Sequence, residues 1–171
     1  MSAQAWLYIF IFLIIFSFSF SSILDYINDK NWNDEIPESL KDYYDKNRYK
    51  KAKEYKKARG KISLISSLMS IIITLVILIS GFYGAVSDYI FERYSSSFLH
   101  SGFFFLFFYL INLFISIPIS YYSTFVIEEK FGFNKTTNKI FIIDLIKGLF
   151  VSIIIGGALL AAALFIYDYF N

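Results

Sequence analysis

Four long runs of apolar residues alternate along the chain with polar stretches, and this pattern predicts its architecture. The runs cover about residues 5–24, 62–86, 98–120 and 140–167. Each reaches the roughly 17–25 residues that a helix needs to cross a hydrocarbon core of about 30 Å. They lack the polar–apolar alternation of membrane barrel strands, so they predict helices. We therefore expect an all-α, polytopic membrane helix bundle with four transmembrane helices, and a single membrane domain over residues 1–171.

The composition supports the same class of protein. Hydrophobic residues make up 57% of the chain and aromatic residues 22%, whereas an ordinary soluble domain is roughly 45–50% apolar. We therefore expect the chain to be embedded in a lipid bilayer. No Lys or Arg precedes Lys30, which favours a retained first helix over a cleaved signal peptide. Scarce Pro with abundant Ile, Lys, Asn and Phe suggests an AT-rich bacterial genome, so we expect a bacterial cytoplasmic membrane.

Basic residues are distributed unevenly among the three connections. Of the 16 Lys and Arg residues, 11 lie between the first two runs, four lie around the third connection, and one, Arg93, lies in the second. Cytoplasmic loops carry an excess of basic residues. The distribution predicts cytosolic loops at residues 25–61 and 121–139, with both termini outside the cytosol.

The first connection predicts a cytosolic amphipathic helix. Pro37 stands where a first helical turn would begin, and no Gly or Pro occurs between Glu38 and Arg59. The helix is expected to continue past Gly60 into the second membrane helix. Its weak apolar stripe is formed by Leu40, Tyr44, Ala52 and Tyr55. Acidic residues are interleaved with the basic ones, and no known nucleic-acid recognition motif occurs. We therefore expect a solvated helix that lies near anionic lipid headgroups, and no nucleic-acid partner.

A short charged loop between the third and fourth runs is the main candidate site. Two aromatic residues flank Gly132, which can adopt positive φ, so we expect an ordered turn that folds back toward the bundle. A structural role and a functional role both fit this arrangement. The candidate residues are Glu128, Glu129, Lys130, Phe131, Gly132, Phe133 and Asn134.

Small residues recur along the fourth run and predict close helix packing. Such residues let two helix backbones approach within a membrane. The residues concerned are Gly148, Ser152, Gly156, Gly157 and Ala161.

The chain lacks the usual ligands of a catalytic zinc ion. An H-E-x-x-H motif needs two histidines on one helix face, but His100 is the single histidine and there is no cysteine. A histidine-dependent nucleophilic triad at the cytosolic loops is excluded for the same reason. We expect no metal site and no catalytic residue in this chain. His100, at the outward start of the third run, is expected to be interfacial and hydrogen-bonded.

Several segments resemble the integral-membrane CAAX prenyl proteases, which are zinc metallopeptidases of the gluzincin type. The run Glu-Glu-Lys-Phe-Gly-Phe-Asn at residues 128–134 is similar to their cytosol-facing loop. Residues 24–28, 36–38 and 44–55 resemble their first cytosolic loop, and residues 144–149 extend the similarity. The resemblance implies the N-terminal membrane domain of such an enzyme, without its metallopeptidase part.

The resemblance also implies a role. In the full-length family a zinc-bound water hydrolyses the peptide bond after a prenylated cysteine. This chain would form chamber wall or a substrate-binding part, would be inactive alone, and would hold no cofactor. Its partners would be a separate metallopeptidase chain or a prenylated peptide. The alternative is a non-catalytic membrane interaction protein derived from that family, and a neighbouring reading frame encoding H-E-x-x-H would favour the split enzyme.

Overall fold

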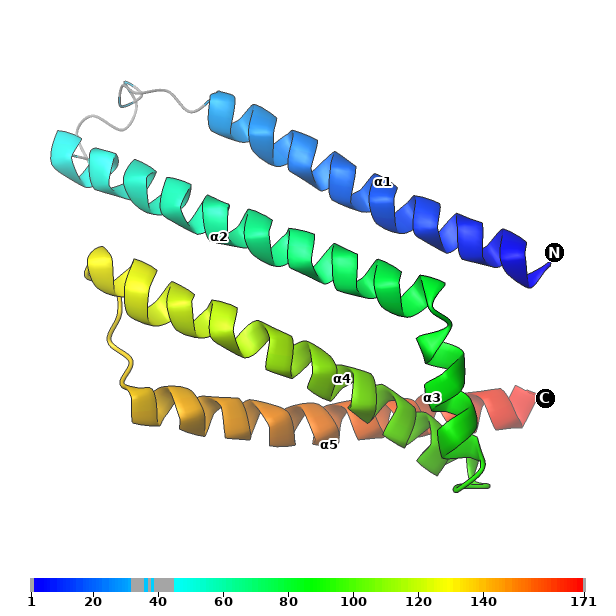
Figure 1. The fold of residues 1–171 in the computed structure, drawn as a ribbon. Coiled ribbons are helices and arrows are strands. Elements are labelled where there is room, and N and C mark those ends of the chain that lie inside the picture. The colour runs from blue at the N-terminus through cyan, green and yellow to red at the C-terminus, as the bar shows by residue number, and fades with distance from the viewer. Residues whose placement is uncertain (1, 32–35, 37, 39–44, 171) are drawn as a thin grey trace. The chain divides into compact units, whose positions relative to one another are not determined.

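Helices account for nearly all of the described structure. The computed structural model describes residues 2–31, 36, 38 and 45–170 (Figure 1). No strand occurs among these residues, so the expected all-α class is confirmed. In chain order the elements are α1 (Ala3–Lys30), α2 (Lys46–Ile79), α3 (Phe82–Phe91), α4 (Ser97–Tyr122), the π-helix η2 (Ser123–Glu128) and α5 (Asn138–Phe170).

Four helical segments are long and apolar enough to cross a membrane. They are Ala3–Lys30, Lys46–Ile79, Ser97–Glu128 and Asn138–Phe170. Most of their large apolar side chains are exposed on the protein surface: Phe114 is 71% exposed and Phe165 is 72% exposed. Water would not stabilise such a surface, whereas lipid tails can cover it while each helix satisfies its own backbone groups. The expected number of four spans is confirmed, and the protein is an integral membrane protein.

The chain divides into two compact units, Met1–Ser80 with Tyr121–Asn134, and Gly81–Ser120 with Lys135–Asn171. In the first unit, α2 packs against both α1 and η2. In the second unit, aromatic rings of α3 meet those of α4, as in the pair Tyr83 and Phe108 with centroids 4.5 Å apart. The expectation of a single membrane domain stays a prediction.

The second span ends earlier than its apolar run indicates. We expected it to extend to residue 86, but α2 ends at Ile79 and a separate helix, α3, begins at Phe82. Gly81 lies between them with φ of +71°. A glycine in this left-handed conformation commonly ends a helix, so α2 ends here although the residues that follow remain apolar.

The charged half of α2 is continuous with its membrane half, as expected. The helix begins at Lys46, where the Oδ1 atom of Asp45 accepts a hydrogen bond from the backbone N–H of Asn47 at 2.6 Å. It passes through Gly60 without a break, because one glycine in a long helix costs only about 1 kcal/mol. The earlier part of the expected amphipathic helix, with Leu40 and Tyr44, lies outside the described residues.

The third connection is shorter than expected. Residues 121–139 were expected to form a loop, but α4 continues to Tyr122 and η2 continues to Glu128. No Gly or Pro interrupts this stretch before Gly132, so the helical conformation persists beyond the apolar run. The last helix then begins at Asn138, where the Oγ1 atom of Thr137 accepts a hydrogen bond from the N–H of Ile140 at 3.3 Å.

The small residues of α5 make few close contacts within their unit. A Cβ atom at Gly148, Gly156 or Gly157 would meet no heavy atom within 4 Å. Ser152 accepts a hydrogen bond from the Tyr109 hydroxyl at 3.1 Å. The close helix approach expected at this face is therefore not seen among the described residues, and the packing role of these positions, including Ala161, stays a prediction.

Candidate functional site

Charged and aromatic side chains of α2 meet the turn that follows η2, within the first compact unit. We call this group the turn cluster: it is formed by Lys51, Tyr55 and Arg59 of α2 with Glu128, Phe131, Gly132 and Phe133. The three α2 residues are spaced four apart, which places them on one face of the helix. The cluster therefore joins the charged half of α2 to the candidate loop.

Arg59 makes the polar connection in the turn cluster. Its Nη1 atom donates hydrogen bonds to Glu128 Oε1 at 2.9 Å and to the Tyr55 hydroxyl at 3.1 Å. The Arg59 side chain is 51% exposed and that of Glu128 is 26% exposed. Water screens an ion pair of this exposure. The pair therefore orients the two segments more than it stabilises them.

Tyr55 makes the apolar connection. Its ring meets the rings of Phe131 and Phe133 edge-on, with centroid distances of 5.5 Å and 4.8 Å. Phe131 is only 5% exposed, whereas Phe133 is 50% exposed. The Nζ atom of Lys51 lies 5.4 Å from the Phe133 ring centroid, within the range of a cation–π contact. The turn thus folds back onto α2, and Phe131 is its buried anchor.

The backbone of the turn closes the end of the preceding helical segment. The N–H groups of Phe133 and Asn134 donate to the carbonyl of Glu128 at 2.8 Å and 3.3 Å, and the N–H of Gly132 donates to the carbonyl of Glu129 at 2.9 Å. Gly132 has φ of +71°, a conformation that glycine adopts readily because it has no Cβ atom. This arrangement satisfies carbonyls that a helix end would otherwise leave unpaired.

The remaining candidate residues lie beside the turn cluster. The side-chain amide of Asn134 donates to Glu129 Oε2 at 2.9 Å. The Nζ atom of Lys130 lies 5.6 Å from the ring centroid of Phe131. The sequence analysis did not single out Arg59 as a partner of this turn. The four-residue spacing of Lys51, Tyr55 and Arg59 was the available indication.

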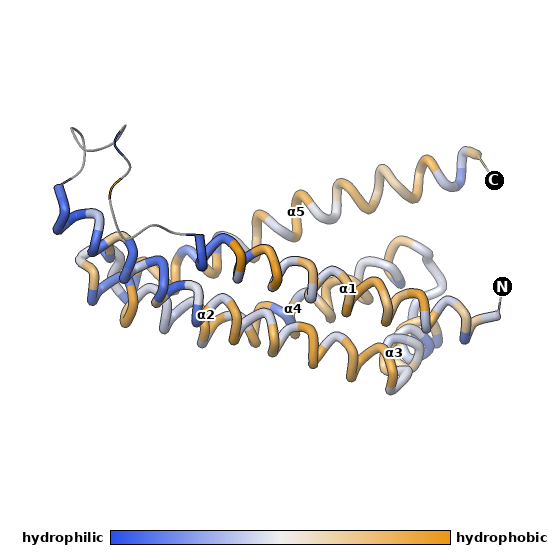
Figure 2. Tube along the Cα trace, turned by 90° about the horizontal axis from the view of Figure 1, so that it is seen from above, coloured by the Kyte–Doolittle hydropathy of each residue, from blue (hydrophilic) through white to orange (hydrophobic). Residues whose placement is uncertain are grey.

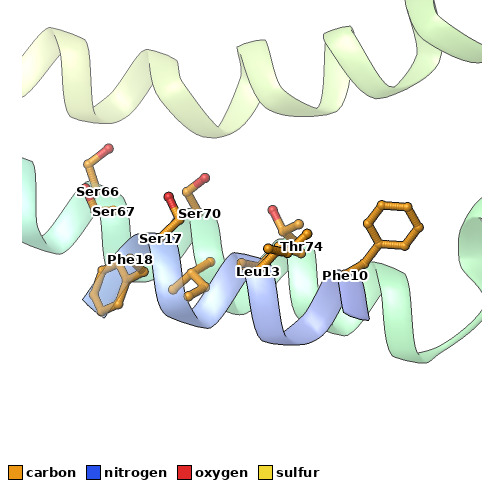
Figure 3. Close-up of a pocket in the computed structure, with 10 residues that line it drawn as sticks. Phe10, Leu13, Ser17, Phe18, Ser66, Ser67, Ser70 and Thr74 are labelled. Atoms are coloured by element: carbon orange, nitrogen blue, oxygen red, sulfur yellow. The ribbon is translucent and has the colours of Figure 1, made fainter. Parts of the chain in front are cut away.

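A groove of about 600 Å³ lies between α1 and the apolar half of α2. Hydroxyl groups occupy one side of it: Ser66, Ser70 and Thr74 follow one another along α2, and Ser17 comes from α1 (Figure 3). The sequence analysis did not identify this row. The available indication was that hydroxyl residues recur every four positions within the second apolar run. The other lining residues are Phe10, Leu13, Ile14, Phe18, Ser67 and Ile71.

The hydroxyl row continues the polar face that begins in the turn cluster. From Tyr55 the positions Arg59, Ser63, Ser66, Ser70 and Thr74 are spaced three or four residues apart, which keeps them on one side of α2. Polar side chains inside membrane spans generally face a protein interior or a water-filled cavity. The face therefore distinguishes one side of α2 from its lipid-compatible side.

Metal-binding groups do not gather in the described part of the chain. Among those residues, no three His, Cys, Asp or Glu side chains lie close enough to hold a metal ion. The Nε2 atom of His100 lies 3.2 Å from both the hydroxyl and the carbonyl oxygen of Ser87. His100 thus has the hydrogen-bonded position that was expected.

These features define the class as an integral membrane protein with a polar site where the charged part of α2 meets the turn. Residues 25–171 match the protein family described as "CAAX prenyl protease N-terminal, five membrane helices". The chain belongs to this family. The described residues contain four helices of membrane-spanning length together with the shorter α3.

Individual relatives and a solved structure agree with this assignment. The chain is 32% identical over 143 residues to the CAAX prenyl protease 1 homolog of Dictyostelium discoideum, covering 78% of this chain and 33% of that protein. It is 36% identical over 139 residues to the probable CAAX prenyl protease 1 of Schizosaccharomyces pombe, covering 70% and 29%. The crystal structure of S. mikatae Ste24p matches with a TM-score of 0.82 and 32% identity, covering 96% of this chain and 40% of that one.

The coverage shows which part of the relatives this chain represents. It spans about a third of the length of the two curated relatives, and it corresponds to their N-terminal membrane domain and not to a catalytic domain. These relatives are eukaryotic, which argues against the bacterial cytoplasmic membrane that we expected. Amino-acid composition reflects the base composition of a genome, which does not separate bacteria from eukaryotes.

The link between Arg59 and Glu128 can be measured by a double-mutant cycle. We expect Arg59→Ala and Glu128→Gln each to lower the free energy of unfolding by about 1 kcal/mol or less, with a coupling of similar size, because both groups are partly solvated. Thermal unfolding of the purified variants in detergent would provide the comparison. A coupling near zero would contradict this prediction, because the pair would then contribute nothing measurable to stability.

Proposed function

We propose that this chain forms the membrane part of a CAAX prenyl protease-like metallopeptidase, with the polar face of α2 as one wall of its substrate chamber. The continuous polar face from the turn cluster to the groove carries this proposal. In this proposal the chain supplies no zinc ligand or catalytic residue, and the zinc chemistry belongs to a separate metallopeptidase chain or to a further part of the same protein.

The groove offers both of the surfaces that a prenylated peptide would need. Its α1 side contributes mainly aromatic and aliphatic side chains such as Phe10 and Leu13, together with the hydroxyl of Ser17. Its α2 side contributes mainly the hydroxyl row. Hydroxyl groups in contact with hydrocarbon lose hydrogen bonds, whereas a hydrated groove satisfies them. A substrate with an apolar prenyl group and a polar peptide could contact both sides.

The membrane orientation is part of the same proposal. Contact between Arg59 and Glu128 requires the first and third connections to lie on one side of the membrane, which agrees with their shared excess of basic residues. The positive-inside rule makes that side cytosolic. The turn cluster, including Glu128 and Phe133, would then stand at the cytosolic opening of the chamber, and both termini would lie outside the cytosol.

Cysteine accessibility tests the chamber wall directly, because the chain contains no native cysteine. We expect the Ser70→Cys and Thr74→Cys variants to react with a charged, membrane-impermeant thiol reagent in opened membranes. Ile72→Cys and Val76→Cys are matched controls, since the native side chains are 58% and 60% exposed on another side of the same helix. We expect the controls to react at least about tenfold more slowly, because lipid excludes a charged reagent.

The chamber proposal would be overturned if all four cysteine variants were equally protected from the reagent, since the groove would then be dry.

The membrane orientation requires a second measurement. The Lys50→Cys variant should remain unlabelled when the reagent is added outside sealed cells, and it should become labelled after permeabilisation. Labelling of this variant from outside would reverse the proposed topology without affecting the chamber result.

A further inference from the structure

Five lysines follow one face of the charged half of α2. At 100° per residue they fall within about 80° of the helix circumference, and they extend over about 22 Å of its axis. Figure 2 shows this end of α2 as strongly hydrophilic, in contrast to its apolar half. We call this face the lysine stripe, formed by Lys46, Lys50, Lys53, Lys57 and Lys61.

Two other faces of this half-helix have partners. Lys51, Tyr55 and Arg59 contact the turn, and the Nζ atom of Lys56 pairs with Asp29 Oδ1 of α1 at 3.0 Å. Within the stripe, Lys46, Lys50, Lys57 and Lys61 are all exposed. None of these four forms an ion pair among the described residues. Glu54 is the single acid between Lys46 and Lys61, so the face keeps a net positive charge.

We propose that Lys57 and Lys61, at the membrane end of the stripe, bind the headgroup of an anionic phospholipid. The apolar half of α2 begins at Ile62, and both lysines lie within about 8 Å of it along the helix axis. The headgroup layer on each side of a bilayer is roughly 5–8 Å thick. Lysines beside an anionic membrane surface are attracted to its phosphate and carboxylate groups. Their flexible aliphatic stems let the ammonium groups reach that layer.

The two lysines at the far end of the stripe distinguish between two possible partners, a lipid and an acidic protein. Lys46 and Lys50 lie about 18–24 Å from Ile62 along the helix axis. This exceeds the Debye length of about 8–10 Å at physiological salt. A lipid headgroup would therefore use the near pair, Lys57 and Lys61, whereas an acidic protein lying along the stripe would use both pairs. The near pair stands at the start of the apolar half, which favours the lipid.

The test compares two double variants that remove the same charge from the same face. Lys57→Gln/Lys61→Gln changes the near pair and Lys46→Gln/Lys50→Gln changes the far pair. Native mass spectrometry of the purified chain in neutral detergent would give the dissociation constant of the first bound phosphatidylserine, with phosphatidylcholine as the neutral comparison. We expect about a 30-fold weaker constant for the near-pair variant, equivalent to about 2 kcal/mol, and less than about a threefold change for the far-pair variant.

Further controls decide between the explanations. Lys57→Arg/Lys61→Arg keeps the charge and should retain phosphatidylserine binding, and phosphatidylcholine binding should not change in any variant. Glycerophosphoserine, the headgroup without acyl chains, should not compete at equal concentration. An unchanged near-pair variant would overturn the proposal. Equal losses in both pairs, or full competition by glycerophosphoserine, would also overturn it, because the stripe would then recognise a protein or a soluble phosphate. Equal thermal unfolding temperatures would exclude misfolding of the glutamine variants.

Discussion

Replacing Gly132 with valine is expected to destabilise the chain by about 1–3 kcal/mol, the usual range for a residue forced into an unfavourable backbone conformation. Gly132 has φ of +71°, and a β-branched side chain is strongly disfavoured there. A Cβ atom would lie 3.8 Å from Lys51 Nζ, an ordinary contact. The cost therefore arises from the backbone and not from a clash. The apparent Tm of the purified variant in detergent should fall accordingly.

Two matched variants isolate the backbone effect. Gly132→Asn should lose much less stability, because asparagine tolerates the left-handed region better than other residues. Gly60→Val makes the same chemical change within α2, where a Cβ atom would meet no heavy atom within 4 Å, and it should cause no loss because valine is a better helix former than glycine. If Gly132→Val unfolds at the wild-type temperature, the turn does not have the described conformation.

Truncation of Phe131 should have an effect at least as large. Phe131 is 5% exposed and contacts Tyr55, so Phe131→Ala removes a buried ring and leaves a cavity. Such a substitution costs about 3–5 kcal/mol in well-packed cores. We expect a value near the lower end, because Phe131 is one of only three buried apolar residues among those described. Thermal unfolding in detergent would again provide the measurement.

Phe133→Ala is the control for this prediction. Phe133 occupies the same turn and contacts the same tyrosine, but it is 50% exposed. Its truncation removes less buried surface and should cost about half as much, because the hydrophobic gain is roughly proportional to the area buried. Equal losses for the two variants would contradict the assignment of Phe131 as the buried anchor of the turn.

The sequence alone determined the features of this protein that depend on local pattern. Span length and apolar composition are properties of consecutive residues, so the four membrane-spanning helices followed from the hydropathy pattern. Continuity through Gly60 and the positive φ of Gly132 also followed, because both reflect the intrinsic conformational preferences of short segments. The charged turn between two apolar runs carried the family resemblance that the comparisons confirmed.

The tertiary structure decided which faces meet. Arg59 and Glu128 are 69 positions apart, and no local rule pairs this arginine, among many bases, with that acid. The sequence likewise did not distinguish Phe131, which is buried, from Phe133, which is half exposed. The physical reason is that lipid tails are as apolar as a protein interior, so hydrophobicity marks a membrane helix without indicating its inward side. For the same reason the hydroxyl row of α2 became recognisable as one wall of a groove only when α1 was placed beside it.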